Sequence, residues 1–404
     1  MDSYAVFWLA GIGFLWWPAI MLLTLWDRRV HHRRPIALWL TTSSLVASLL
    51  VAVALQASFS RLLGAVANLS VWITVCAVLA RRDEDLDVGG VIRGVVDLAA
   101  FQGVLVIVAR LGYPAFSGTR LPLARLLPAS LADDANVAAF STVRLAFLDY
   151  YNKVVIRTGG IFGTPTWAGA LAAIAILLLL FAGDSLGPFV RRPVVRLPLV
   201  ALFGTTLFLS YARVDVVALG LAAGAIIAMN ARRVVHPSLW LATVFLAIGA
   251  VFAVLPVLPL HAWFADVNNA RQGSLVARGD IYTPTLKAIL KAPTPVLGSG
   301  IKPRVNGLVA SLGTHGTYLG LAYRGGLVCA ASFLVFLMAL AARSLDRDAE
   351  LAFGLACFLL IWCLTDDIDA GNLMPLVIVI AYGSMLVRSG RRKDWAPSAL
   401  EAPS

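Results

Sequence analysis

Apolar blocks of about twenty residues, repeated along the whole chain and nearly free of charge, constrain this sequence more than any other feature. A helix of that length spans a hydrocarbon core of about 30 Å. Hydrophobic residues occupy 60% of the 404 positions and charged residues only 14%, too little charge to cover a water-soluble domain of this size. We therefore expect an all-α, polytopic integral membrane protein, with residues 1–404 forming a single transmembrane domain in contact with the lipid bilayer.

The blocks predict about eleven transmembrane helices. They lie near residues 4–26, 36–57, 62–80, 91–111, 160–182, 197–211, 213–230, 238–258, 316–342, 350–365 and 372–388. The first block is too long for the core of a signal peptide, and no small-residue cleavage site follows it. We expect it to be retained as a span.

Basic residues recur in alternate connections between the blocks. They are Arg28, Arg29, Arg33, Arg34, Arg81, Arg82, Arg191, Arg192, Arg196, Arg232, Arg233, Arg343 and Arg347. The positive-inside rule then predicts an outside N-terminus and a cytoplasmic polar tail over residues 389–404. The net charge of +11 is thus explained by membrane orientation, and its distribution in short clusters excludes a nucleic-acid groove.

Two long connections are predicted to face outward, over residues 113–159 and 259–314. In the first, the apolar periodicity of 140–156 predicts an amphipathic helix at the interface. In the second, Thr283 and Pro284 predict the start of a helix that runs to Lys291. Ordered connections of this length are usually functional, so we expect the second one to carry a catalytic site.

Four polar residues are predicted to meet at the outer face: Arg157, Arg213, Arg278 and His315. Guanidinium groups bind phosphate bidentately and keep their charge, and histidine accepts a hydroxyl proton near neutral pH. Taken singly, each arginine is better explained as an anchor to lipid head groups than as a phosphate ligand. Arg213 departs from that explanation, because it lies in a short outer connection against the positive-inside trend.

The same residues stand in four segments that resemble the O-antigen ligase and polymerase superfamily. Arg157–Pro165 resembles its R-x-x-G-x-F-x-x-P entry to a span, and Ser210–Leu219 its S-x-x-R-x-x-x-x-x-L helix start. Arg278–Gly300 is similar to its R-x-x-x-[WY] loop that ends in P-x-x-G-x-G, and Thr314–Gly326 to its H-N-x-Y-L helix. The segments occur in the superfamily's order and cover about the C-terminal two-thirds of the chain.

This resemblance implies an inverting, metal-independent membrane glycosyltransferase without a cofactor. Such an enzyme moves a glycan from an undecaprenyl-diphosphate donor to an acceptor glycan or glycolipid, at the outer face of the bacterial cytoplasmic membrane, as a polymerase or a ligase. The resemblance implies that Arg213 and Arg278 bind the diphosphate, that His315 is the base toward the acceptor hydroxyl, and that Arg157 binds phosphate or positions a loop. Gly316 departs from the pattern, since asparagine usually follows the histidine.

Arg324 is a second departure, because the superfamily usually has an acidic or neutral residue there; we interpret it as one half of an interior ion pair. Asp366, Asp367 and Asp369 resemble the carboxylates of metal-dependent type-C glycosyltransferases, but three carboxylates on a short loop are more often solvated, and we expect no metal site.

The alternative function is a secondary transporter or flippase for a lipid-linked or anionic substrate, in which Asp97, Asp215 and Arg324 form an intramembrane relay. The odd number of spans and the lack of visible repeats disfavour it. A membrane scaffold without chemistry is the third hypothesis.

Overall fold

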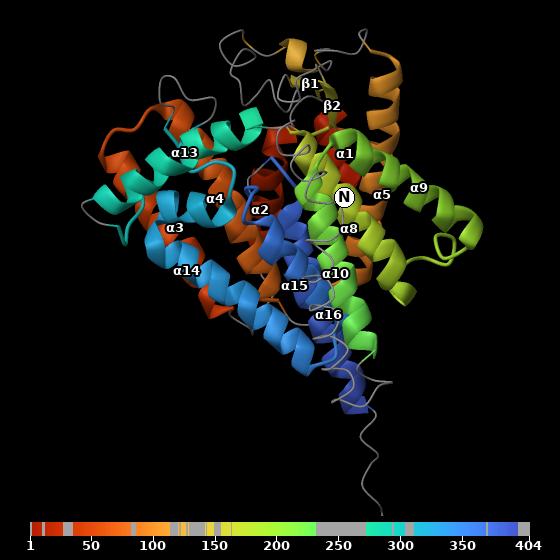
Figure 1. The fold of residues 1–404 in the computed structure, drawn as a ribbon. Coiled ribbons are helices and arrows are strands. Elements are labelled where there is room, and N and C mark those ends of the chain that lie inside the picture. Colours follow the sequence, from red (N-terminus) through yellow and green to blue (C-terminus); the bar gives the residue numbers. More distant parts are fainter. Residues whose placement is uncertain are drawn as a thin grey trace, which may run out of the picture.

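A computed structural model describes most of the chain. It covers residues 2–9, 13–26, 35–81, 86–113, 120, 123–126, 128, 142, 144–148, 155–162, 164–231, 272–292, 295–303, 311–368 and 371–394. Over these residues the chain is mostly helical (Figure 1). The elements are α1 (Asp2–Leu9), η1 (Gly13–Leu15), α2 (Trp16–Trp26), α3 (Ile36–Ala54), α4 (Phe59–Leu79), α5 (Val88–Leu111), η3 (Leu123–Leu126), β1 (Arg144–Leu148), β2 (Val155–Gly160), α8 (Pro165–Phe181), η4 (Gly183–Ser185), α9 (Pro193–Ser210), α10 (Arg213–Ala231), α13 (Gln272–Lys291), α14 (Thr317–Asp346), α15 (Glu350–Trp362) and α16 (Met374–Asp394).

The helices make this chain a membrane protein. Six of those described are long and apolar enough to cross a bilayer, namely α3, α4, α5, α9, α10 and α14, and α2, α8, α15 and α16 are shorter apolar helices. Each predicted span except that near 238–258 coincides with one of these ten helices, and the first also takes in α1 and η1. The span near 238–258 lies outside the described residues, so the total of about eleven stays a prediction.

Helix α8 forms the centre of the bundle because its sequence is apolar on every face. Its residues from Ala168 to Leu179 are all buried, as expected for a helix without a polar side. It packs on α5, α9 and α10, and α10 in turn packs on α15. Gly354 brings the last two helices together, because a Cβ atom there would lie 2.4 Å from the Ile226 side chain.

The expectation of an all-α chain is wrong at one point, the antiparallel hairpin of β1 and β2, which lies at the top of the view in Figure 1. The register pairs Leu148 with Val155 and Leu145 with Thr158. Strand β1 and the first two residues of β2 fall within the stretch 140–156 that was expected to be an amphipathic helix. The β-branched residues Val155, Ile156 and Thr158 explain the difference, since their stiff side chains favour extended backbone.

Helix α13 begins at Gln272, well before the start predicted at Thr283 and Pro284. Pro284 is therefore inside the helix, where its missing N–H interrupts the backbone ladder. The Thr285 hydroxyl reinforces this turn by donating to the Ile281 carbonyl oxygen over 2.6 Å. In Figure 1, α13 runs across the upper left of the view, at an angle to the upright α10 and α16, and it packs against α14.

Helix α14 is broken at Gly326, and the segment 295–303 fills the break. Gly326 has φ 84° and ψ 173°, so the helix hydrogen bonds cannot continue through it. The backbone groups freed by the break are bonded instead to the segment, through Leu327 N to Pro295 O (3.0 Å), Ser299 N to Tyr323 O (2.8 Å) and Gly300 N to Arg324 O (2.9 Å). A broken helix is tolerated at membrane depth only with such replacements.

The connections between the helices lie at the two ends of the bundle. The first residues of α5 and α15 and the last residues of α8 and α10 surround one cavity, so these connections share one end. Arg191 and Arg347 lie in these connections, and Arg343 is in the last turn of α14 beside them. The opposite end, which holds α13 and the starts of α8, α10 and α14, is called the site end below.

Candidate functional site

His315 lies at the site end, two residues before α14, in the left-handed backbone region (φ 63°). This conformation is uncommon for a residue with a side chain, although histidine adopts it more often than most. The Tyr282 hydroxyl donates a hydrogen bond to the His315 carbonyl oxygen and so holds the backbone here. Burial raises the pKa of Tyr282, which keeps the phenol protonated and able to donate.

Two cations act electrostatically on the His315 imidazole. Burial, and then the positive charges of Arg278 and Lys302, lower its pKa to about 4. The ring is therefore neutral at neutral pH, the form that accepts a proton. The structure thus brings together two of the predicted site residues, Arg278 and His315.

Helix α13 positions its side of the site through its periodicity. Arg278 and Tyr282 are four residues apart and so share a face, which continues to Thr285. The Thr285 hydroxyl accepts a hydrogen bond from the Gly313 N–H over 3.1 Å. This contact ties α13 to the loop that carries His315.

Two carboxylates complete the site, and their placement corrects the expectation of a solvated loop. Asp366 and Asp367 follow α15 and are only 6% and 7% exposed. The Thr317 backbone N–H and hydroxyl both donate to the Asp366 carbonyl oxygen, over 2.9 and 2.8 Å. The turn after α15 is thereby fixed to the first residue of α14, next to His315.

The Asp366 side chain faces cations and a hydroxyl. Burial raises its pKa to about 6, against the opposing effect of Arg278, a hydrogen bond from the Thr166 hydroxyl, and Arg157. Thr166 is in the first turn of α8, so the positive end of that helix also faces the carboxylate.

Asp367 joins two further cations to the site. It forms an ion pair with Lys302, and its Oδ1 atom lies 3.6 Å from an Arg324 terminal nitrogen. The expectation that Arg324 is half of an interior ion pair is thus confirmed, with Asp367 as the partner. Lys302 was not predicted as a site residue. Its position just after the Gly298–Gly300 turn is visible in the sequence, but the sequence alone does not show that this turn brings Lys302 close to His315.

A second group of charges adjoins the first through Asp215. This buried aspartate accepts a hydrogen bond from the Trp362 indole over 3.0 Å and interacts electrostatically with Asp366 and Arg157. Gly169 makes room for it, since a Cβ atom there would lie 2.4 Å from the Asp215 carboxylate.

The two other predicted arginines lie beside this second group. Arg157, in β2, is buried and donates through Nε to the Ser210 carbonyl oxygen over 2.7 Å. Of its two expected roles, this contact fits loop positioning. Arg213 is the first residue of α10, half-buried and two positions from Asp215.

A divalent cation at this site would require several oxygen ligands, such as the carboxylates of these aspartates. Over the part of the chain that the structure describes, no group of three or more His, Cys, Asp or Glu side chains is arranged to hold a metal ion. Asp369 lies outside the described residues. The Asp366 carboxylate accepts a hydrogen bond from the Thr166 hydroxyl, and that of Asp367 pairs with Lys302 and Arg324.

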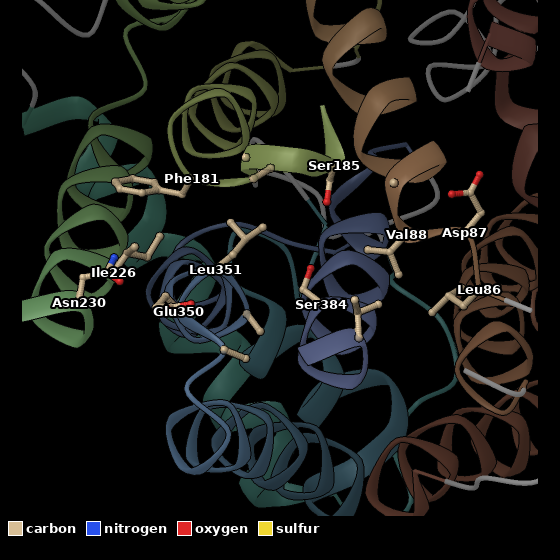
Figure 2. A pocket seen from close by; sticks show the side chains of 16 residues that line it. Leu86, Asp87, Val88, Phe181, Ser185, Ile226, Asn230, Glu350, Leu351 and Ser384 are labelled. Carbon is tan, nitrogen blue, oxygen red and sulfur yellow. The ribbon is translucent and has the colours of Figure 1, made fainter. Parts of the chain in front are cut away.

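A cavity of about 650 Å³ lies at the opposite end of the bundle (Figure 2). In this view Asp87 and Glu350 lie on opposite sides of it, with Ser384 between them. Asp87 is the N-cap residue of α5, and its carboxylate accepts a hydrogen bond from the Gly90 N–H over 2.7 Å. The cavity is remote from the cations and the histidine, so we place the candidate site elsewhere.

Comparison of the chain with protein-family models, curated proteins and solved structures gave no match. The chemistry of the site therefore rests on its own geometry. Cations beside a neutral imidazole, at one end of a membrane bundle, can bind a phosphate group and accept a proton from a hydroxyl.

Proposed function

We propose that this chain is a membrane glycosyltransferase, which moves a glycan from an undecaprenyl-diphosphate donor to an acceptor glycan or glycolipid. The observation that carries the proposal is that the Tyr282 hydroxyl holds the half-buried His315 where the charges of Arg278 and Lys302 act on its neutral ring. The four sequence segments that resemble the O-antigen ligase and polymerase superfamily support the same conclusion. The proposal includes both a polymerase and a ligase, which share this donor chemistry.

The proposed step is a displacement at the anomeric carbon of the donor sugar. The acceptor hydroxyl oxygen forms the new glycosidic bond, while the bond from the anomeric carbon to the phosphate oxygen breaks and the configuration inverts. His315 accepts the proton of the acceptor hydroxyl, and undecaprenyl diphosphate leaves with the bonding electron pair. Arg278 and Arg213 bind this diphosphate, because fixed cations stabilise the charge that develops on it.

The proposed membrane arrangement follows the positive-inside rule. The site end faces outward from the bacterial cytoplasmic membrane, the arginine-bearing connections face the cytoplasm, and about eleven spans complete the bundle. A donor carried by a lipid then reaches the site from the outer leaflet.

The position of the charges favours this function over the alternative transporter. A transporter requires its key charges near the bilayer midplane. Asp215 is in the first turn of α10, and Arg324 pairs with Asp367, which follows the end of α15. Both charges belong to the site end, where a transferase requires them.

The test uses purified full-length protein, undecaprenyl-diphosphate oligosaccharide, candidate acceptor glycans and excess chelator. We expect the wild type to release undecaprenyl diphosphate, and Arg213→Ala, Arg278→Ala and His315→Ala to lose this release. His315→Ala should keep its affinity for the donor, because the base acts on the acceptor. Lys291→Ala, an exposed cation at the end of α13, is the matched control and should retain activity. Full turnover by His315→Ala would remove the base assignment, and no release by the wild type would reject the transferase.

A further inference from the structure

The backbone around Lys302 is held more firmly than an exposed loop requires. The segment 295–303 is bonded to the broken α14 as described above, and the Gly298 N–H donates to the Ser48 hydroxyl of α3 over 3.1 Å. The Arg61 guanidinium of α4 donates to the Lys302 carbonyl oxygen over 3.0 Å. Three helices thus determine where the Lys302 side chain begins.

The Lys302 ammonium group acts on a carboxylate and on the imidazole. It pairs with Asp367, and its charge also acts on the His315 ring. Its side chain is 15% exposed, whereas that of Arg324, the other cation on Asp367, is 4% exposed. Lysine has a flexible four-carbon stem, so of these two cations Lys302 is the one able to turn toward a ligand.

Asp367 stays compensated when Lys302 turns away. Arg324 is held by its Nε atom, which donates to the Gly320 carbonyl oxygen over 3.3 Å, and its terminal nitrogen faces the Asp367 carboxylate. A buried carboxylate without a cation would be costly, and this second cation avoids that cost. Asp367 is thus paired with one fixed cation, Arg324, and one movable cation, Lys302.

We propose that Lys302 is a substrate-binding residue. When the donor binds, the Lys302 ammonium group moves from Asp367 to the donor diphosphate, and Arg324 remains paired with Asp367. This inference rests on the proposed function. Lys302 then adds a third cation to Arg278 and Arg213 on the leaving group. Without donor, the ion pair with Asp367 holds the Lys302 ammonium group away from the diphosphate position. Donor binding is weakened by the free energy needed to break this ion pair.

The test measures the binding of undecaprenyl diphosphate, and separately of inorganic pyrophosphate, to the full-length protein in nanodiscs. Loss of one charge-assisted hydrogen bond predicts that Lys302→Met raises Kd for both probes about tenfold or more and reduces the salt dependence of binding. Lys302→Arg should retain most of the affinity. Lys291→Met is the matched control and should bind as the wild type does.

Asp367→Asn separates a binding role from a structural one. If the Lys302–Asp367 ion pair competes with donor binding, Asp367→Asn releases the Lys302 ammonium group and lowers Kd for both probes. If the ion pair is only structural, Lys302→Met and Asp367→Asn raise Kd to the same extent. A wild-type Kd for Lys302→Met overturns the inference even where Asp367→Asn does not fold. If the wild type binds both probes tightly and Lys302→Met binds them equally well, the inference about Lys302 fails and the proposed function stands. If the wild type binds neither probe, both the inference and the proposed function are overturned.

Discussion

Substitution of Gly326 by alanine tests whether the break in α14 holds the candidate site together. The backbone conformation at Gly326, φ 84° and ψ 173°, is one that glycine alone adopts readily. A Cβ atom added there would lie 1.8 Å from the Val296 carbonyl oxygen. Helix α14 and the segment 295–303 must therefore separate to admit a methyl group.

The expected cost follows from two contributions. Backbone strain at such a position costs about 1–3 kcal/mol. The three backbone hydrogen bonds between the segment and α14 contribute about 1 kcal/mol each and are lost on separation. We expect Gly326→Ala to reduce the free energy of unfolding by about 4–6 kcal/mol, a large share of the stability of a typical protein. The displaced segment carries Lys302, so binding of undecaprenyl diphosphate should weaken as well.

A thiol-reactive fluorophore provides the assay, because Cys76, Cys329 and Cys363 are buried and react only on unfolding. On heating in detergent, Gly326→Ala should react at a clearly lower temperature than the wild type. Gly224→Ala, inside α10, is the control: a Cβ atom there meets nothing within 4 Å, and alanine is the better helix former. If Gly326→Ala and the wild type unfold at the same temperature, the account of the broken helix is refuted.

Three further predictions concern the site. Tyr282→Phe removes the donor to the His315 carbonyl oxygen, so kcat should fall several-fold at unchanged donor affinity; equal loss of affinity would contradict a role in positioning the base. As pH falls through about 6, protonation of Asp366 removes a negative charge beside the diphosphate site, so donor binding should tighten, and Asp366→Asn should abolish this dependence relative to the wild type. Trp362→Phe leaves a buried Asp215 oxygen without its donor and should cost about 1–3 kcal/mol of stability in the thiol assay, with an unchanged unfolding temperature as the contrary result.

The helices were predictable because a membrane imposes a simple rule on sequence. A backbone in hydrocarbon must satisfy its own hydrogen bonds, so an apolar block of sufficient length becomes a helix. The blocks at 36–57 and 91–111 accordingly match α3 and α5 within a few residues. The rule does not apply outside the hydrocarbon, which is why the β1–β2 hairpin and the true start of α13 were missed.

The candidate site was predictable in part, for a related reason. Arg278 and His315 were found because charge and chemistry in a predicted outer connection are visible in the sequence. Lys302 was missed, and Asp366 and Asp367 were expected to be solvated. Their burial depends on the turn after α15 closing on the start of α14, a contact between residues about fifty positions apart.

The sequence by itself determined that the chain is a membrane protein, where most of its described apolar helices lie, and which charged residues are available for chemistry. Only the tertiary structure decided the partners of those charges: Arg324 with Asp367, Arg157 with Ser210, and Lys302 close to His315. The physical reason is that hydrophobic burial follows from local composition, whereas an ion pair requires two side chains to meet within a few ångströms. That meeting depends on how broken helices and their connecting segments pack.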